Sequence, residues 1–416
     1  MPTPREPISE SGAAPLRGRD IPPTAGLPLQ WRDLLPGGPA DLETRIASWL
    51  GVEALQLECS GTSSLVVALL TLARRSARKT VVLPAYTCPL VALAVHHCGL
   101  RPKLCDLAPG HFDFDPAALE QACDGDTLAV VVTHLAGRVA DTAAALRCAA
   151  RCGAAVVEDA AQALGARRNG RSVGLDGDIG FFSLAAGKGL SIYEGGLLLA
   201  RDPALRRELR ATSDRAVGSR PAWELRRSAE LLAYAMLYGP RGMRWAYGNP
   251  QRAALRAGDP VRAAGDDFPL DIPIHRVGRW RRGVGARAAR RLPAFLDEAR
   301  VRARLRLQRL QALPGIKVMQ DTAGGDGVWP FFMLVLPDAQ SRQRALDRLW
   351  GAGLGVGPLF VHTLPDYDYL RPIVADAPVP HARDFAARTL SITNSHWLDD
   401  EGFEAICAAL ASLLEP

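Results

Sequence analysis

The sequence predicts an α/β protein with a large, mostly parallel central sheet flanked by helices and a smaller C-terminal α/β domain. Between residues 51 and 200, short apolar runs alternate with helical stretches, a pattern typical of a sheet covered by helices on both faces. A separate strand-helix-strand pattern begins near residue 313. With 416 residues, the chain can bury a large core and form more than one structural unit.

The individual elements follow from periodicity and from their breaking residues. A helix with a charged face is predicted over Asp41–Leu50, and an Arg/Leu-rich helix over Asp297–Leu310. The C-terminal part predicts a strand at Trp329–Leu336, a helix at Ser341–Trp350 and a closing helix at Asp399–Leu414. The strands predicted in the first half are Gln56–Cys59, Thr80–Leu83, Arg101–Asp106, Leu128–Thr133, Ala155–Glu158, Ile179–Ser183 and Gly196–Ala200.

Composition divides the chain into regions. Residues 1–27 are rich in Pro, Gly, Ser and charge and predict a flexible N-terminal arm. A large domain over 28–213 follows. Residues 214–270 mix Arg and Trp with Gly and Pro and predict a variable insert that shapes the acceptor site or a dimer interface. Connecting helices over 271–312 lead to a small domain over 313–416.

One apolar stretch inside the insert, Leu231–Tyr238, is too short to cross a bilayer. A helix packed on the dimer interface or on the mouth of the active site is the favoured interpretation. A helix lying in a membrane interface is the alternative.

Charge and cysteine content narrow the class of protein. The net charge of +6 comes from arginines spread along predicted helices, and few aromatic residues lie among them, so no nucleic-acid partner is expected. The eight cysteines include no Cys-x-x-Cys pair, which predicts neither a metal site nor a disulfide framework. With no signal peptide and no membrane span, we expect a cytoplasmic protein.

Lys188 is the most informative single residue. The chain has four lysines among 50 basic residues, so arginine fills most surface roles. Lys188 lies in a small-residue loop, Gly180–Leu190, that follows an apolar run. An amine can form a Schiff base, whereas a guanidinium cannot. The alternative is an ordinary solvated lysine.

Two further signals give that lysine a context. The apolar run before Asp159 predicts a buried strand ending in a carboxylate, and strand ends are where open α/β sheets bind ligands. Small residues at Ser60–Ser64 precede a helical stretch, and such a helix start binds anions. An amine, a carboxylate and a phosphate cradle are the groups that hold pyridoxal 5'-phosphate. Taken singly, each is also common at solvated turns and strand ends.

The order and spacing of these motifs resemble the DegT/DnrJ/EryC1/StrS family of sugar aminotransferases, which belong to fold type I of the pyridoxal phosphate-dependent transferases. The resemblance is specific from about residue 40 to 210 and looser over about 270–400. The motifs that carry it are Ser60-Gly61-Thr62-Ser63-Ser64, Pro84–Thr87, Glu158–Gly165, Gly177–Ser183 and Lys188–Gly196.

The resemblance implies a role for individual residues and a homodimer. Lys188 is the Schiff-base lysine and proton shuttle, Asp159 holds the pyridine nitrogen, and Gln162 lies near the cofactor hydroxyl. Gly61, Thr62 and Ser183 are the implied phosphate ligands.

The sequence departs from the family in three places. Cys88 stands where the family has an aromatic residue that stacks on the pyridine ring, and Tyr86 is the alternative stacking partner. The family's Gly-Tyr-Asn-x-Arg segment, whose Asn reaches the partner's phosphate, is not recognisable; His275, Arg276 and Arg279 are the candidates to replace it. The insert at 214–270 is the third departure.

The resemblance implies transfer of an amino group from a donor such as glutamate to a nucleotide-linked keto-sugar, with pyridoxamine 5'-phosphate as the intermediate form. The pathway would make amino sugars, surface polysaccharides or natural products. Another fold type I enzyme acting on a non-sugar ketone, and a non-catalytic sensor or assembly protein of the same fold, remain alternatives. Lys188 argues against the related sugar dehydratases, which have a histidine there.

Overall fold

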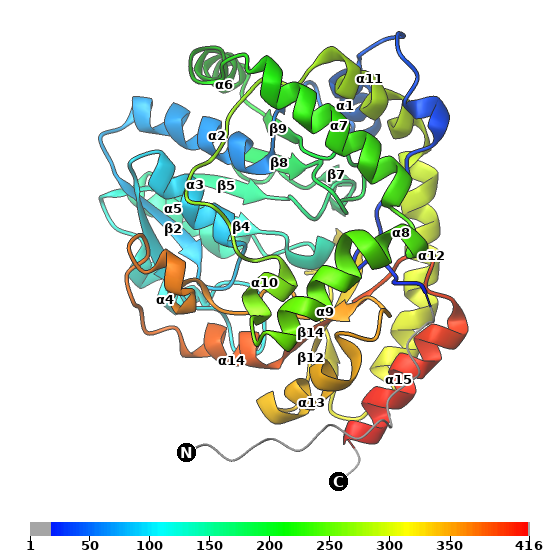
Figure 1. Cartoon of the computed structure of the whole chain (residues 1–416). Helices are drawn as coiled ribbons and strands as arrows, with labels where there is room; N and C mark the ends of the chain where they lie inside the picture. Colours follow the sequence, from blue (N-terminus) through cyan, green and yellow to red (C-terminus); the bar gives the residue numbers. More distant parts are fainter. Residues whose placement is uncertain (1–17, 415–416) are drawn as a thin grey trace.

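The computed structural model describes residues 18–414, and a seven-stranded sheet forms its centre (Figure 1). Strands β2, β3, β4, β5 and β8 pair in parallel, and β9 and β1 add antiparallel at one edge. The predicted strands all occur, each within one residue of its predicted bounds. In sheet order they are β1 (Gln56–Glu58), β9 (Gly196–Ala200), β8 (Ile179–Ser183), β5 (Ala155–Asp159), β4 (Thr127–Thr133), β2 (Thr80–Pro84) and β3 (Arg101–Cys105).

Helices cover both faces of this sheet because its strands are apolar on both sides. In β4, Ala129 and Val131 belong to one buried cluster, whereas Val130 and Val132 belong to another. The first cluster includes α2 (Gly61–Arg75), α3 (Pro89–His97) and α6 (Pro203–Ala216), and the second includes α4 (Pro116–Ala122) and α5 (Ala143–Cys152). Alternating side chains of one strand therefore enter two cores.

A second, antiparallel sheet lies in the C-terminal part. Its order is β10 (Lys317–Val318), β12 (Phe331–Val335), β14 (Thr389–Thr393) and β13 (Val356–Gly357). The predicted strand and helices of this part are confirmed with shifts of one or two residues. The two predicted helices are α13 (Ala339–Leu349) and the closing α15 (Asp400–Leu414); a third helix, α14 (Pro380–Arg388), was not predicted.

Short elements connect these two parts. A small third sheet pairs β6 (Arg167–Arg168) with β7 (Arg171–Ser172) and with β11 (Gly325–Asp326). The long helix α12 (Leu292–Gln311) contains the predicted Arg/Leu-rich helix, and it follows α11 (Arg279–Ala288), which packs against α1 (Leu42–Leu50).

The segment predicted as an insert is mostly helical. It contains α7 (Pro221–Leu237), α8 (Pro240–Met243), the π-helical turn η3 (Arg244–Gly248), α9 (Asn249–Arg256) and α10 (Pro260–Ala264). In Figure 1 these green helices lie in front of the C-terminal ends of the parallel strands. Among residues 18–414, no helix combines the length and apolar character needed to cross a bilayer.

The prediction of a flexible arm over residues 1–27 is wrong for its second part. Residues 1–17 lie outside the described residues, whereas Ile21, Ala25 and Leu27 are buried. The backbone N–H of Ala25 donates to the Pro330 carbonyl at 2.8 Å. A proline-rich segment resembles a loose arm in composition, but here it is extended and its polar backbone groups pair with distant parts of the chain.

Candidate functional site

A cavity of about 610 Å³ opens at the C-terminal ends of the parallel strands. Its wall comes from the starts of α2 and α3, the ends of β4, β5 and β8, the loop around Lys188, the helix α7, the end of α10 and the residues 265–273 that follow it. All of the site residues predicted from the sequence line this one cavity: Gly61, Thr62, Cys88, Asp159, Gln162, Ser183 and Lys188.

The start of helix α2 gives the cavity an anion-binding end. The Ser60 hydroxyl caps the helix by accepting a hydrogen bond from the Ser63 N–H at 2.9 Å. Within residues 18–414, the N–H groups of Gly61 and Thr62 have no hydrogen-bond partner. A Cβ on Gly61 would lie 3.2 Å from the Ser183 Cβ. Because glycine has no side chain, Ser183 can lie close beside these N–H groups. Free N–H groups at the positive end of a 15-residue helix favour a phosphate.

Asp159 and Lys188 bring opposite charges into the middle of the cavity. Asp159 ends β5 and is 4% exposed, and its Oδ1 accepts a hydrogen bond from the Ala161 N–H at 3.0 Å. Burial raises the pKa of the Asp159 carboxyl, and nearby Lys188 opposes that rise. Burial lowers the pKa of Lys188, which makes its neutral, nucleophilic form more available.

The neighbouring carboxylate, Glu158, has a structural role. Successive strand residues point to opposite faces, so Glu158 lies away from the cavity, fully buried. It accepts hydrogen bonds from His134 Nε2 at 2.9 Å, the Gly174 N–H at 2.9 Å and the Gly177 N–H at 2.7 Å. Burial alone would raise the pKa of Glu158, but these hydrogen bonds outweigh it and lower the pKa.

Gln162 is oriented by the backbone. Its Oε1 accepts a hydrogen bond from the Ala136 N–H at 2.6 Å. Because the oxygen is occupied, its NH₂ group is the end that can donate to a ligand in the cavity.

Cys88 lines the cavity as a neutral thiol, because burial raises its pKa to about 12. The alternative prediction, that Tyr86 stacks on the pyridine ring, is wrong. Its buried ring contacts Phe360 and Phe385, each with ring centroids 5.5 Å apart, and its hydroxyl hydrogen-bonds the Phe360 backbone. The chain bends after β2, so the alternation expected for an extended segment does not apply.

The loop that carries Lys188 is held from two sides. The Thr24 hydroxyl donates to the Gly187 carbonyl at 2.6 Å, and the Leu27 N–H donates to the Gly189 carbonyl at 3.0 Å. From the other side, the Gly187 N–H donates to the Tyr234 hydroxyl of α7 at 3.3 Å. The N-terminal segment and the predicted insert therefore position the lysine together.

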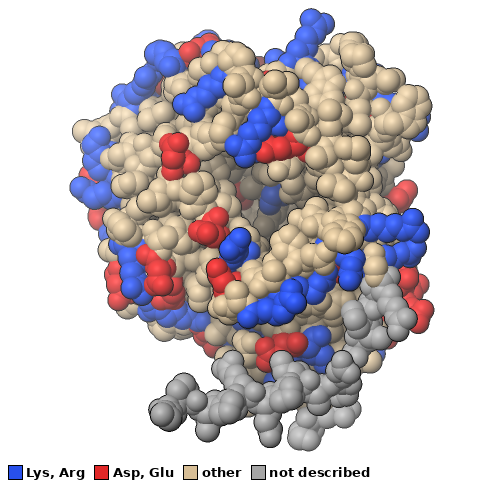
Figure 2. All heavy atoms as spheres, viewed as in Figure 1, with Lys and Arg blue, Asp and Glu red and all other residues tan. Residues whose placement is uncertain are grey.

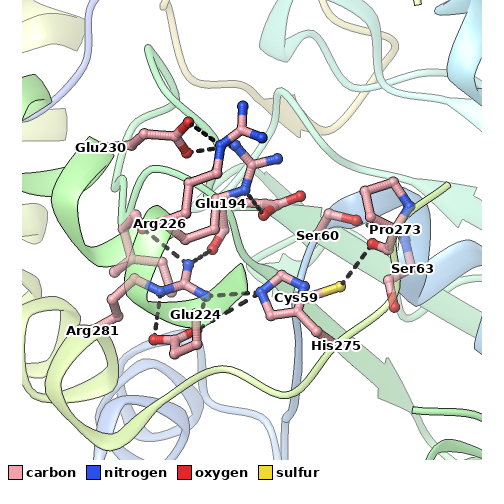
Figure 3. Close-up of polar contacts among 12 residues, drawn as sticks. Cys59, Ser60, Ser63, Glu194, Glu224, Arg226, Glu230, Pro273, His275 and Arg281 are labelled. Atoms are coloured by element: carbon pink, nitrogen blue, oxygen red, sulfur yellow. Dashed lines mark hydrogen bonds and ion pairs between the residues drawn. The ribbon is translucent and has the colours of Figure 1, made fainter. Parts of the chain in front are cut away.

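A buried arginine connects α7 to the turn after the lysine (Figure 3). Arg281 is fully buried and donates to both Glu224 oxygens, at 2.9 and 2.5 Å, and to the Glu194 carbonyl at 2.6 Å. It also lies 3.2 Å from His275 Nε2. Burial and Arg281 lower the pKa of His275 to about 4, so this histidine is neutral.

His275 is therefore a poor candidate for reaching a partner subunit, because its side chain is enclosed by its own chain. Arg276 and Arg279 are both exposed, and Arg276 pairs with Asp214 at 3.3 Å.

No pattern in the sequence distinguishes Arg227 from the other arginines of its segment. This residue of α7 lines the cavity together with Glu194, and its Nε lies 2.5 Å from a Glu194 oxygen. It also pairs with Glu230 at 2.6 Å. Burial raises the pKa of Glu194, and Arg227 opposes that rise. The predicted insert thus contributes a guanidinium to the cavity wall.

Comparison with known proteins finds a family match over part of the chain. Residues 37–235, just under half of the chain, match the DegT/DnrJ/EryC1/StrS aminotransferase family. Similar proteins include MosB of Rhizobium meliloti, 38% identical over 168 residues, which is 40% of this chain and 33% of MosB. Another is the UDP-N-acetyl-3-dehydro-α-D-glucosamine 3-aminotransferase of Acidithiobacillus ferrooxidans, 36% identical over 171 residues, which is 41% of this chain and 46% of that enzyme. The matched part thus spans between a third and a half of these relatives.

A solved structure of similar fold extends the match beyond that region. The putative sugar aminotransferase Spr1654 from Streptococcus pneumoniae, in its PMP form, superposes with a TM-score of 0.72 at 17% identity, covering 93% of this chain and 98% of that one. At that identity the likeness shows the fold, which is the fold type I architecture of pyridoxal phosphate-dependent transferases.

The match to the DegT/DnrJ/EryC1/StrS family implies pyridoxal phosphate, and the residues of the cavity fit it. The cavity has unpaired N–H groups at a helix start for a phosphate, a buried carboxylate for a pyridine nitrogen and an amine for an aldehyde. The aromatic stacking residue typical of this family is absent at Cys88, and Tyr86 does not replace it.

Replacement of Arg281 by methionine should lower the free energy of unfolding by about 3–5 kcal/mol, because it leaves the Glu224 carboxylate without its buried partner. The matched control is Arg282→Met, whose half-exposed side chain pairs with Glu43 and should cost about 0–1 kcal/mol. Urea unfolding of both variants measures the difference. Equal costs would contradict the structural role of Arg281.

Proposed function

We propose that this protein is a pyridoxal phosphate-dependent aminotransferase that moves an amino group from a donor such as glutamate to a keto-sugar, most simply a nucleotide-linked one, in amino-sugar, surface polysaccharide or natural-product biosynthesis. The observation that carries the proposal is the meeting of Lys188, Asp159 and the open start of α2 in one cavity. The eight cysteines are all free, which supports a reducing compartment such as the cytoplasm.

Each predicted residue would have a separate task at the cofactor. Bound pyridoxal phosphate supplies an electron sink for the carbon that loses or gains nitrogen. Gly61, Thr62 and Ser183 would hold the phosphate, and Gln162 would donate to the ring hydroxyl. Asp159 would keep a proton on the pyridine nitrogen, because a nearby carboxylate favours the charged ring.

Lys188 would have two tasks. Its amine would hold the cofactor covalently until the donor amine displaces it. The freed amine, whose pKa burial lowers, would then carry a proton to and from the reacting substrate carbon. The turn Glu194–Gly196 and the hydrogen bonds to Gly187 and Gly189 fix the loop that presents this amine.

The wall formed by α7 would act on the acceptor. Arg227 and Glu194 provide a cation and a carboxylate in the cavity, groups that can bind sugar hydroxyls or a phosphate. The UDP-sugar named for the Acidithiobacillus relative supports a nucleotide-linked acceptor.

Lys188→Ala should abolish covalent attachment of pyridoxal phosphate and lower turnover with glutamate by about 10⁴-fold, because one amine is lost as both anchor and base. Borohydride reduction of the wild type followed by peptide mapping should place the cofactor on the peptide that contains Lys188. Lys103→Ala is the control, because Lys103 pairs with Asp124 at the surface. A label on Lys79, Lys103 or Lys317 would refute the assignment.

Asp159→Asn should lower the rate by about 10- to 10³-fold while the cofactor stays bound. An amide does not stabilise a protonated pyridine, so the pKa of the pyridine nitrogen should fall by about 1–3 units. Single-turnover absorbance measurements with glutamate would report the rate, and equilibrium dialysis the occupancy. Asp126→Asn, a change at an exposed carboxylate, serves as the control. A rate near that of the wild type would rule out this role of Asp159.

We further propose a two-fold homodimer in which residues near Arg276–Arg282 and the 231–238 stretch lie closest to the partner's cavity. Sedimentation of the cofactor-loaded protein should give a dimer. Arg276 and Arg279 are both exposed, and one of them would reach the cofactor phosphate in the partner's cavity. One of the substitutions Arg276→Ala and Arg279→Ala should therefore weaken cofactor affinity, and the other should change it little. A cofactor-loaded monomer, or tolerance of both substitutions, would count against the shared site.

A further inference from the structure

The outer face of α7 is an exposed apolar stripe. Leu225, Leu232 and Met236 are 73%, 41% and 77% exposed, and their spacing of seven and four residues places them along one side of the helix. Ala229 lies between them on the same side, so this stripe carries no charged side chain. In Figure 2 the surface over α7, to the upper right of the central hollow, is mostly uncharged.

The exposed side chains lie on a helix whose opposite side is held by polar contacts. The opposite side of α7 holds Arg227 on Glu194 and the Tyr234 hydroxyl on the Gly187 N–H. Just after the helix, the Tyr238 hydroxyl donates to the Thr24 carbonyl at 3.0 Å and accepts from the Gly26 N–H at 2.8 Å. The apolar stripe therefore faces outward because the other face is committed to the cavity and the lysine loop.

Positive charge is concentrated around the stripe. Residues 215–256 contain eight arginines and two glutamates, so this segment carries +6, which equals the net charge of the whole chain. Glu224 points inward to Arg281, and Glu230 pairs both with Arg227 and with the exposed Arg226, at 2.6 and 3.0 Å. The exposed charges of the segment are thus all arginines, and Figure 2 shows basic groups along the band over α8 and α9.

We propose that the outer face of α7, together with Trp245, docks on the surface of an anionic lipid bilayer. Trp245 follows α8, which packs against α7, and is 72% exposed. Leucine, methionine and tryptophan side chains enter the boundary between headgroups and acyl chains, and surrounding arginines attract anionic lipids. Contiguous exposed apolar surface of this kind marks an interaction site.

Charge favours this occupant over a second copy of the chain. A two-fold contact brings each surface patch against itself. The exposed arginines beside the stripe, such as Arg220, Arg226 and Arg241, would then face the same arginines with no exposed acid from the segment between them. An anionic surface is complementary to this pattern. The proposal takes the exposed side chains of Leu232 and Met236 out of the dimer contact proposed above for the 231–238 stretch and leaves that contact to the Arg276–Arg282 region. It does not depend on the aminotransferase activity.

The test is sedimentation of the full-length protein with vesicles. Vesicles of phosphatidylcholine mixed with an equal share of phosphatidylglycerol should bind the wild type, and pure phosphatidylcholine vesicles should bind it much less. Leu225→Ser/Met236→Ser should weaken binding about tenfold or more by removing apolar contact. Arg226→Gln/Arg241→Gln should weaken vesicle binding about fivefold for each arginine. The binding that remains should depend less on salt concentration than that of the wild type.

The matched control is Val301→Ser/Leu305→Ser in α12, whose side chains are 52% and 68% exposed on another helix, and it should bind like the wild type. Thermal unfolding of every variant checks the fold, and the arginine pair still tests the site if the serine pair does not fold. Absence of binding to anionic vesicles would overturn the proposal, as would binding that neither the serine pair nor the arginine pair weakens. Conversion of a dimer to monomers by the serine pair would assign the face to a second copy instead.

Discussion

The buried carboxylate of Glu158 fixes the point around which the cavity is built. It accepts hydrogen bonds from His134 Nε2 and from the backbone N–H groups of Gly174 and Gly177, so the end of β5 cannot shift without leaving buried donors unpaired. The next residue, Asp159, consequently faces Lys188 from a fixed position. Because adjacent strand residues point to opposite faces, one Glu-Asp pair provides both a structural anchor and a carboxylate in the cavity.

Residues of the 214–270 segment also line the cavity, alongside the ends of the sheet strands. Helix α7 supplies Arg227 to the wall, holds the lysine loop through Tyr234, and is tied to α11 through the buried Arg281. Because one face of α7 makes these contacts, its opposite face is left exposed. The same packing that positions Lys188 therefore produces the apolar stripe at Leu225 and Met236.

Errors in the sequence-based predictions share one cause. Strand alternation predicts that Tyr86 points toward the cavity, but the chain bends after β2 and the ring packs against Phe360. The sequence makes His275 a candidate to reach a partner, yet Arg281 and Glu224 enclose it. Residues 18–27 have the composition of a loose arm, yet they pair with the lysine loop. Each of these outcomes depends on contacts with residues far away in the sequence, which local pattern does not contain.

The sequence by itself determined the α/β class, the strands of the main sheet and seven of the residues that line the cavity. It could do so because apolar periodicity sets each strand, and because the ends of parallel strands meet at one edge of a sheet. Only the tertiary structure decided that Arg227 faces the cavity, that Glu158 is an anchor rather than a ligand, and that one face of α7 stays exposed. Burial and pairing of these groups depend on which distant elements pack together, and that packing is a property of the whole chain.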